Sequence, residues 1–250
     1  LPGIVVPELT IIICTLRRTA FLSDLLSSLL AQSGALPAFE VLVVDNDPAQ
    51  SARDLVERAA SASVPIRYLP EPRPGVSHAR NAGVASARGA DILFLDDDQR
   101  VAPDFLSALW IAWQDRPIHL RGLRVRVEPR RDGQEHPAPH ARMVASAQED
   151  YTPVARGDFG TGGLIVQRSL LMDFEGPFQP ELGLGGEDTE LFLRASARGY
   201  HFGHLSSVAV EERVTRARAG LPYLLRAQLR SGLLDAELDV ARAESLAHTR

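Results

Sequence analysis

The chain has 250 residues, a formal net charge of −5 at pH 7 and 45% hydrophobic residues, and all 27 of its basic residues are arginine. The absence of lysine excludes P-loop nucleotidases, protein kinases and pyridoxal enzymes, because each class depends on a lysine that meets a phosphate or forms a Schiff base. The net acidity argues against a nucleic-acid partner, since such partners favour an extensive basic face. Any phosphate-bearing ligand must therefore be met by arginine, backbone N–H groups or a metal ion.

The single cysteine and the shortness of the apolar segments favour a cytoplasmic protein. Cys14 is the only cysteine and lies in an apolar run, so we expect a reduced, buried thiol. The first residues show no basic stretch ahead of a long apolar one, and no apolar run approaches the ~18 residues of a membrane span. We therefore expect a cytoplasmic protein without a signal peptide or a membrane span.

The first hundred residues alternate strand-like and helix-like segments. Continuous apolar runs predict strands buried on both faces at 9–15, 40–44 and 90–95, with a shorter strand at 66–69. Amphipathic spacing predicts helices at 19–30, 51–62, 77–88 and 104–114. This alternation predicts an α/β fold with a Rossmann-like, doubly wound, mostly parallel sheet. Its ligand crevice is expected at the carboxyl ends of the strands.

Beyond the fourth helix the periodicity loosens. The sequence predicts a half-exposed strand at 120–127, a long surface loop at 128–150, a strand at 162–167 and a helix at 187–197. Two short strands are expected at 200–204 and 208–211. From Gly220 leucines recur along one side of the chain, which predicts a C-terminal helical extension.

The most acidic segment directly follows the strand predicted at 90–95. Asp96, Asp97 and Asp98 are adjacent carboxylates that repel one another unless a cation or solvent offsets their charge. Carboxylates are hard ligands that suit Mg²⁺ or Mn²⁺, and such an ion also bridges two phosphates. The alternative is a solvated junction between a strand and a turn.

A second polar group, Asp45, Asn46 and Asp47, follows the strand predicted at 40–44. Such side chains pair with a base or a ribose, but the sequence DNDP is also a good turn former. Because the carboxyl ends of parallel strands share one edge of a sheet, both acidic groups are expected beside the same crevice.

A third acidic group lies in GGEDTELFLR, where Glu187, Asp188 and Glu190 occupy the first turn of a predicted helix. Acids at this position complement the helix dipole, and a carboxylate at a crevice rim also suits general base catalysis. Two more segments have functional and structural interpretations. The first is PGVSHARNAG, in which Arg80 either reaches a nucleotide or is an exposed polar residue of a helix. The second is FGTGG, which either lines a sugar pocket or forms a β-turn.

Taken in order, these motifs resemble those of family 2 glycosyltransferases, the nucleotide-diphospho-sugar transferases of the GT-A fold. The matching segments lie between Thr10 and Tyr200 and read TIIICTLRRT, FEVLVVDNDP, PGVSHARNAGVASARGADILFLDDDQ, FGTGGLIV and GGEDTELFLRASARGY. The segment from Ala209 looks like that of bacterial exopolysaccharide transferases of the succinoglycan glucosyltransferase kind. Glu211 and Glu212 stand where many relatives place a metal-binding histidine.

The resemblance implies a role for each matching residue. It assigns the nucleotide to Cys14, Thr15, Asp45 or Asn46, Arg80, Asp96 and Asp97. It assigns a divalent metal, Mn²⁺ or Mg²⁺, to Asp98 and general base catalysis to Asp188. Thr161, Gly162 and Glu187 are expected to contact the acceptor or the donor sugar.

These roles imply an inverting transfer of a sugar from a nucleotide-diphosphate donor, with UDP favoured, to a hydroxyl of a saccharide or lipid-linked acceptor. The implied organisation is a catalytic domain at 1–212, with a nucleotide-binding half at 1–115 and an acceptor-binding half at 116–212, and an extension at 213–250. Because five arginines and no acid lie between Arg213 and Arg230, the extension either docks on the inner face of an anionic membrane or packs on the catalytic domain.

The sequence is also compatible with two other functions. A nucleotidyltransferase of related fold also uses a metal and an acidic cluster, although its first strand is expected to lead into a glycine-rich basic loop, and CTLRRT has no glycine. A non-catalytic module that binds a sugar nucleotide is the second alternative. The presence of both LDDD and GED argues against it.

Overall fold

The computed structural model describes residues 6–60, 64–130, 149–154, 159–182 and 185–214. Most of the loop expected at 128–150 and nearly all of the extension expected at 213–250 lie outside these residues. Among the helices that are described, none is long and apolar enough to cross a membrane.

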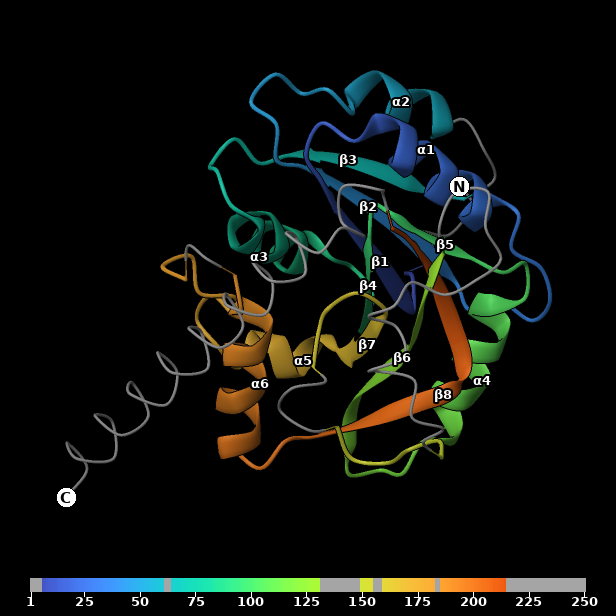
Figure 1. Ribbon diagram of the computed structural model, residues 1–250, viewed down its shortest axis with the longest axis vertical. Coiled ribbons are helices and arrows are strands. Elements are labelled where there is room, and N and C mark those ends of the chain that lie inside the picture. The colour runs from blue at the N-terminus through green and yellow to red at the C-terminus, as the bar shows by residue number, and fades with distance from the viewer. Residues whose placement is uncertain (1–5, 61–63, 131–148, 155–158, 183–184, 215–250) are drawn as a thin grey trace.

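One mixed sheet runs through the described chain, in the strand order β3-β2-β1-β4-β7-β6-β8-β5 (Figure 1). Its parallel half contains β1 (Leu9–Thr15), β2 (Phe39–Asp45), β3 (Ile66–Pro70) and β4 (Asp91–Asp96). The other half contains β5 (Gln99–Val101), β6 (Leu120–Arg130), β7 (Leu164–Gln167) and β8 (His201–Arg213). There β6 and β8 are parallel, whereas β7 runs antiparallel to β4 and β6, and β5 runs antiparallel to β8. The predicted α/β class with a mostly parallel sheet is confirmed.

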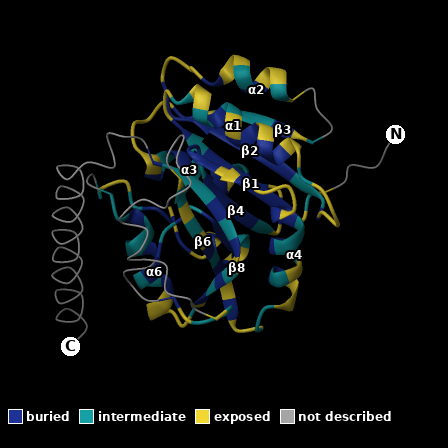
Figure 2. Ribbon diagram, turned by 45° about the vertical axis from the view of Figure 1, so that its right-hand side comes forward, coloured by how far each residue is buried: buried dark blue, intermediate teal, exposed yellow. Residues whose placement is uncertain are grey.

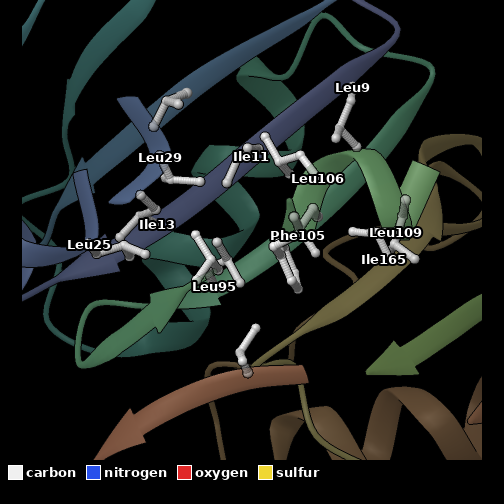
Figure 3. Close-up of a cluster of buried hydrophobic side chains, with 14 of the residues drawn as sticks. Leu9, Ile11, Ile13, Leu25, Leu29, Leu95, Phe105, Leu106, Leu109 and Ile165 are labelled. Carbon is white, nitrogen blue, oxygen red and sulfur yellow. The ribbon is translucent and has the colours of Figure 1, made fainter. Parts of the chain in front are cut away.

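Helices cover both faces of this sheet. One face carries α1 (Thr19–Leu30), α2 (Arg53–Ala59) and α4 (Phe105–Asp115). The other face carries α3 (Val76–Ser86), α5 (Arg168–Met172) and α6 (Glu187–Ala197). Because side chains alternate along a strand, Ile11 and Ile13 of β1 enter the first core and Ile12 enters the second. Figure 3 shows the first core, where Leu25 and Leu29 of α1 pack against β1. The central strands β1, β2 and β4 are almost entirely buried, whereas the outer helix faces are exposed (Figure 2).

The two short strands expected at 200–204 and 208–211 are the two ends of one strand, so that prediction is wrong. β8 pairs with β6 at both of its ends, and between them the register shifts, because Val125 pairs with Leu205 while Arg126 pairs with Ala209. The residues between them form a bulge. Asp150 stabilises it, because its Oδ1 accepts hydrogen bonds from the backbone N–H groups of residues 206 and 207, at 2.7 and 2.9 Å.

Several predicted boundaries also differ from the structure. The strand expected at 162–167 begins at Leu164, because Gly162 and Gly163 form the turn in which the Leu164 N–H donates to the Thr161 carbonyl. The strand expected at 120–127 continues to Arg130, where a loop was expected, and the helices expected at 51–62 and 77–88 span Arg53–Ala59 and Val76–Ser86. None of these differences moves a candidate site residue to another face of the sheet.

A buried carboxylate holds the amino-terminal edge of the parallel strands together. Glu40 is 2% exposed and accepts hydrogen bonds from the Thr10 hydroxyl at 2.9 Å, the Arg67 guanidinium at 3.1 Å and the Arg88 backbone N–H at 3.0 Å. These donors come from β1, β3 and the chain that enters β4. Because every donor is satisfied within the protein, we interpret this cluster as structural.

We predict that Glu40→Ala lowers the free energy of unfolding by about 2–4 kcal/mol, because the partly buried Arg67 loses its carboxylate partner and the Thr10 hydroxyl loses its buried acceptor. Glu57→Ala is the matched control. Glu57 pairs with Arg53 on the surface of α2, where both side chains are about half exposed, and its loss should cost less than about 1 kcal/mol. Urea unfolding of both variants tests this, and equal losses would contradict the structural role of Glu40.

Candidate active site

The carboxyl ends of β1, β2 and β4 open into a pocket of about 680 Å³. The register of the sheet explains why, since Thr15 pairs with Asp45 and Cys14 pairs with Asp96, so the segments that follow these strands meet at one edge. The predicted residues that line the pocket are Cys14, Thr15, Asn46, Arg80, Asp96, Asp97, Asp98, Glu187 and Asp188. Residues more than 170 positions apart in the sequence thus share one cavity.

Asp45 does not line this pocket. Its side chain is fully buried and accepts hydrogen bonds from the backbone N–H groups of Asp47 at 3.0 Å and Ala52 at 2.9 Å, and from the Tyr68 hydroxyl at 3.1 Å. These contacts fit the turn-forming interpretation of DNDP, and the full burial of the side chain keeps it away from the pocket. Of the two alternatives for the nucleotide contact, Asp45 or Asn46, the pocket lining includes Asn46.

Asn46 lies at the pocket wall but is used mainly to shape it. Its amide nitrogen donates to the carbonyls of Glu71 at 2.8 Å and Arg73 at 2.7 Å, and its amide oxygen accepts from the Gly75 N–H at 3.0 Å. The side chain thereby fixes the segment that leads into α3. Val76, which follows this segment, is 40% exposed at the pocket.

The Asp triplet is held by residues of two other segments. Thr15 donates to Asp97 Oδ2 at 2.8 Å, and one nitrogen of Arg18, Nη1, lies 2.6 Å from Asp97 Oδ1 and 3.1 Å from Asp98 Oδ2. Asp96 lies 3.9 Å from the Arg80 guanidinium. Burial and the neighbouring carboxylates raise the pKa values of Asp96 and Asp97, and the two arginines oppose this rise.

The donor chemistry of the pocket fits a divalent cation that a substrate helps to bind. Asp96, Asp98 and Glu212 supply hard carboxylate oxygens to the same cavity. Across the described residues, no three His, Cys, Asp or Glu side chains lie close enough to hold an ion by themselves. Mg²⁺ sites in phosphate-transferring proteins commonly use one or two carboxylates, with the remaining ligands from water and substrate phosphates.

Cys14 faces the pocket as a neutral group. It is a free cysteine, and burial raises the pKa of its thiol to about 12. The thiol therefore stays protonated at physiological pH. We interpret Cys14 as a lining residue rather than a nucleophile.

The opposite wall of the pocket is the first turn of α6. Gly186 precedes the helix with φ of 91°, a left-handed conformation that glycine adopts without strain, and it turns the chain so that Glu187 and Asp188 face the cavity. The Thr189 N–H donates to Asp188 Oδ1 at 2.8 Å. Burial and then the Glu187 charge raise the pKa of Asp188, and they outweigh Arg80 and the helix backbone, which lower it. A general base benefits from such a rise.

Arg80 joins the two walls. Its guanidinium forms a buried ion pair with Glu187 and packs over the Phe178 ring at 5.5 Å. The second carboxylate oxygen of Glu187, Oε2, is buried and has no hydrogen-bond partner among the described residues. Because a buried acceptor is costly to leave unpaired, Glu187 Oε2 is suited to accept a hydroxyl of a bound ligand.

Thr161 and Gly162 lie behind the Asp triplet rather than in the pocket wall. Thr161 is 1% exposed. A Cβ atom at Gly162 would lie 2.4 Å from Asp96 Oδ2 and 2.7 Å from Gln99 Nε2, so only glycine allows this close approach. Neither residue lines the pocket, and their expected contact with a sugar stays a prediction.

Several lining residues were not among the candidate site residues, and three of them, Leu16, Arg18 and Val76, present side chains of interest. Arg18 and Leu16 follow β1 directly, and Val76 begins α3. The sequence feature that could have identified them is their position directly after a strand or at the start of a helix, on the side of the sheet where the crevice lies. Leu16 is 50% exposed and presents apolar surface to the cavity.

Comparisons with known proteins agree with this arrangement. The family model described as "Glycosyl transferase family 2" matches residues 10–171. The chain is 30% identical over 241 residues to the succinoglycan biosynthesis protein ExoM of Rhizobium meliloti strain 1021, covering 94% of this chain and 76% of that protein. It is 33% identical to the validoxylamine A glucosyltransferase of Streptomyces hygroscopicus, over 43% of this chain but only 26% of that enzyme.

Solved structures share the fold. TarS of S. aureus, residues 1–349 in complex with UDP-GlcNAc, has a TM-score of 0.66 and 21% identity, covering 84% of this chain and 59% of that one. The mannosyltransferase PcManGT of Pyrobaculum calidifontis, in complex with GDP-Man and Mn²⁺, has a TM-score of 0.65 and 21% identity, covering 85% and 59%. The chain spans less than two thirds of each of these two structures. Because the family model matches more than half of the chain, including β1 to β4 and the Asp triplet, and because ExoM is 30% identical over 76% of its own length, the chain belongs to glycosyl transferase family 2.

Proposed function

We propose that this protein transfers a sugar from a UDP-sugar to a hydroxyl of a saccharide or lipid-linked acceptor during exopolysaccharide biosynthesis, with inversion at the anomeric carbon. The observation that carries the proposal is the shared pocket. It is lined by the Asp triplet at the end of β4 and by Asp188 of α6, whose pKa is raised. The relationship to ExoM supports the polysaccharide context, and TarS, which was solved with UDP-GlcNAc, supports the donor class. Family membership argues against a nucleotidyltransferase or a non-catalytic module.

The β1 side of the pocket suits a nucleoside. Leu16 and Val76 present apolar surface there, 50% and 40% exposed, beside the neutral groups Cys14 and Thr15. A nucleotide base is flat and largely apolar on its faces, so packing between aliphatic side chains would remove this surface from water. We assign the base and the ribose to this end of the cavity and the diphosphate to the Asp triplet.

The first turn of α6, on the opposite wall of the pocket, provides the groups for the sugar transfer. The acceptor hydroxyl gives its proton to Asp188, its oxygen bonds to the anomeric carbon, and the bond from that carbon to the diphosphate oxygen breaks. Glu187 Oε2 orients a sugar hydroxyl by accepting its hydrogen bond. A divalent cation held by Asp98, with Asp96 and Glu212 nearby, would supply positive charge for the leaving diphosphate.

We predict that Asp188→Asn lowers the transfer rate about 10²–10⁴-fold and leaves UDP affinity within about two-fold of the wild type, because the amide keeps the shape but not the basicity. The matched control is Glu190→Gln in the same helical turn, where the carboxylate pairs with Arg194 outside the pocket lining. Transfer from UDP-glucose or UDP-GlcNAc and UDP calorimetry report the two effects. Ordinary turnover in Asp188→Asn would remove the assigned base.

The pH profile tests the electrostatics of the same group. The base acts only when deprotonated, so activity falls as the pH drops through the pKa of Asp188. Because the Glu187 charge raises this pKa, Glu187→Gln should move the acidic limb of kcat/KM to lower pH, whatever it does to the maximal rate. Glu190→Gln should leave the limb in place. A limb that stays fixed, or moves to higher pH, in Glu187→Gln would contradict the assignment.

A further inference from the structure

Arg18 places a positive charge where the donor's diphosphate is expected. It lies between β1 and α1, and its Nη1 atom contacts Asp97 and Asp98 at 2.6 and 3.1 Å. The two carboxylates are 5% and 4% exposed, whereas the Arg18 side chain is 30% exposed and lines the pocket. The guanidinium thus neutralises buried acids from the solvent side.

Most of the hydrogen-bonding capacity of Arg18 remains unused. Only Nη1 has hydrogen-bond partners among the described residues, and the Nε and Nη2 groups have none there. A guanidinium presents its donors as a planar fork that matches two oxygens of a phosphate. Arg18 can therefore bind a phosphate through its second edge while one nitrogen still contacts a carboxylate.

No other described cation in the pocket wall has this freedom. Arg80 is the one further lining arginine, and it is 8% exposed, paired with Glu187 and close to Asp96. Removing Arg80 from these carboxylates would leave buried charges without a partner, which is expensive. In a chain without lysine, Arg18 is the cation of the described pocket that is able to meet a diphosphate.

An aromatic ring keeps the Arg18 guanidinium near the pocket while its partners change. The Arg18 guanidinium lies 5.3 Å from the centroid of the Phe21 ring, one turn into α1. The Arg213 guanidinium lies 5.2 Å from the same ring and also pairs with Asp24. A cation–π contact does not use the N–H donors, so it survives an exchange of hydrogen-bond partners.

We propose that Arg18 occupies the cation position at Asp98 in the unliganded protein and exchanges this carboxylate for the donor's diphosphate when nucleotide and divalent cation bind. This inference rests on the proposed sugar-nucleotide function and adds a second role to one residue. Before the exchange, Arg18 offsets the repulsion between Asp97 and Asp98 and competes with a divalent cation for Asp98 Oδ2. After the exchange, its fork stabilises the phosphate charge that grows as the sugar leaves.

The exchange couples the two ligands. A divalent cation alone has to displace Arg18 from Asp98 and leaves it with Asp97 as its one charged partner among the described residues, so the cation binds weakly. With a nucleoside diphosphate present, the diphosphate replaces the lost Asp98 contact, and the affinity for the cation rises. By linkage, the cation raises the affinity for the diphosphate by the same factor.

Arg18→Gln tests the exchange, with Arg17→Gln as its matched control. Both variants remove one positive charge next to the acids, but Arg17 is 70% exposed and contacts Asp47 instead of the Asp triplet. We expect Arg18→Gln to bind Mn²⁺ alone several-fold more tightly, measured from the free Mn²⁺ signal in electron paramagnetic resonance. We expect its UDP affinity in Mn²⁺, measured by calorimetry, to fall about 10-fold or more, and its UMP affinity to fall less, because UMP lacks the second phosphate.

Arg18→Lys keeps the proposal testable if Arg18→Gln does not fold. Lysine retains the positive charge at Asp98 but lacks the planar fork. We therefore expect Mn²⁺ affinity within about two-fold of the wild type and a UDP affinity that is again reduced. Arg17→Gln should match the wild type in all three titrations.

Three results would overturn the exchange while the proposed function stands. The first is that the wild type binds UDP in Mn²⁺ and both Arg18 variants bind it with the same affinity. The second is that Arg18→Gln binds Mn²⁺ alone no more tightly than the wild type. The third is that Arg17→Gln shows the same increase in Mn²⁺ affinity as Arg18→Gln. A wild-type protein that binds no UDP at any Mn²⁺ concentration would instead contradict the proposed function itself.

Discussion

Repulsion between the buried carboxylates that follow β4 is the interaction on which the pocket depends. Asp97 and Asp98 are each 4% exposed, and carboxylates so close together cannot all stay charged in such a place without cations. Arg18 approaches from the β1 side and Arg80 from α3, each with its own carboxylate contacts. The segments that follow the parallel strands are thereby drawn together around one cavity.

The two ends of the parallel sheet show how similar chemistry serves different purposes. At the amino-terminal edge, Glu40 meets Thr10, Arg67 and a backbone N–H, and this cluster is closed. At the carboxyl end, Glu187 meets Arg80 through one oxygen and leaves the other buried without a described partner. A network whose polar groups are all hydrogen-bonded stabilises the fold, whereas a buried acceptor without a partner is suited to bind a ligand.

Burial also changes how the first turn of α6 behaves. A carboxylate at a helix N-terminus is usually a weak base, because the helix dipole and the backbone N–H groups favour its charged form. At Asp188 the loss of water and the adjacent Glu187 charge prevail, and the pKa rises. The same acids that would only complement the dipole on an exposed helix become suited to proton transfer in this pocket.

The parallel half of the fold, the helix α6 and most pocket residues were predictable, because long apolar runs and acids at strand ends are local patterns. The continuous β8 was not, since its bulge depends on Asp150, which lies 56 residues earlier than Ser206. The choice between Asp45 and Asn46 stayed open, because the contacts of Asp45 with the next turn and with Tyr68 exist only in the folded chain. Arg18 was not chosen as a site residue, because its partners Asp97 and Asp98 are about 80 positions away in the sequence.

The lack of lysine, which first excluded whole classes of enzyme, sharpens the central claim that nucleotide binding here depends on a divalent cation. Calorimetric titration of the protein with UDP, in Mn²⁺ and then in EDTA, tests it most directly, with Asp98→Asn as the variant that removes the proposed ligand. The account predicts clear binding in Mn²⁺ and at least about 10-fold weaker binding both in EDTA and in Asp98→Asn. Equal UDP affinity with and without the cation would contradict it.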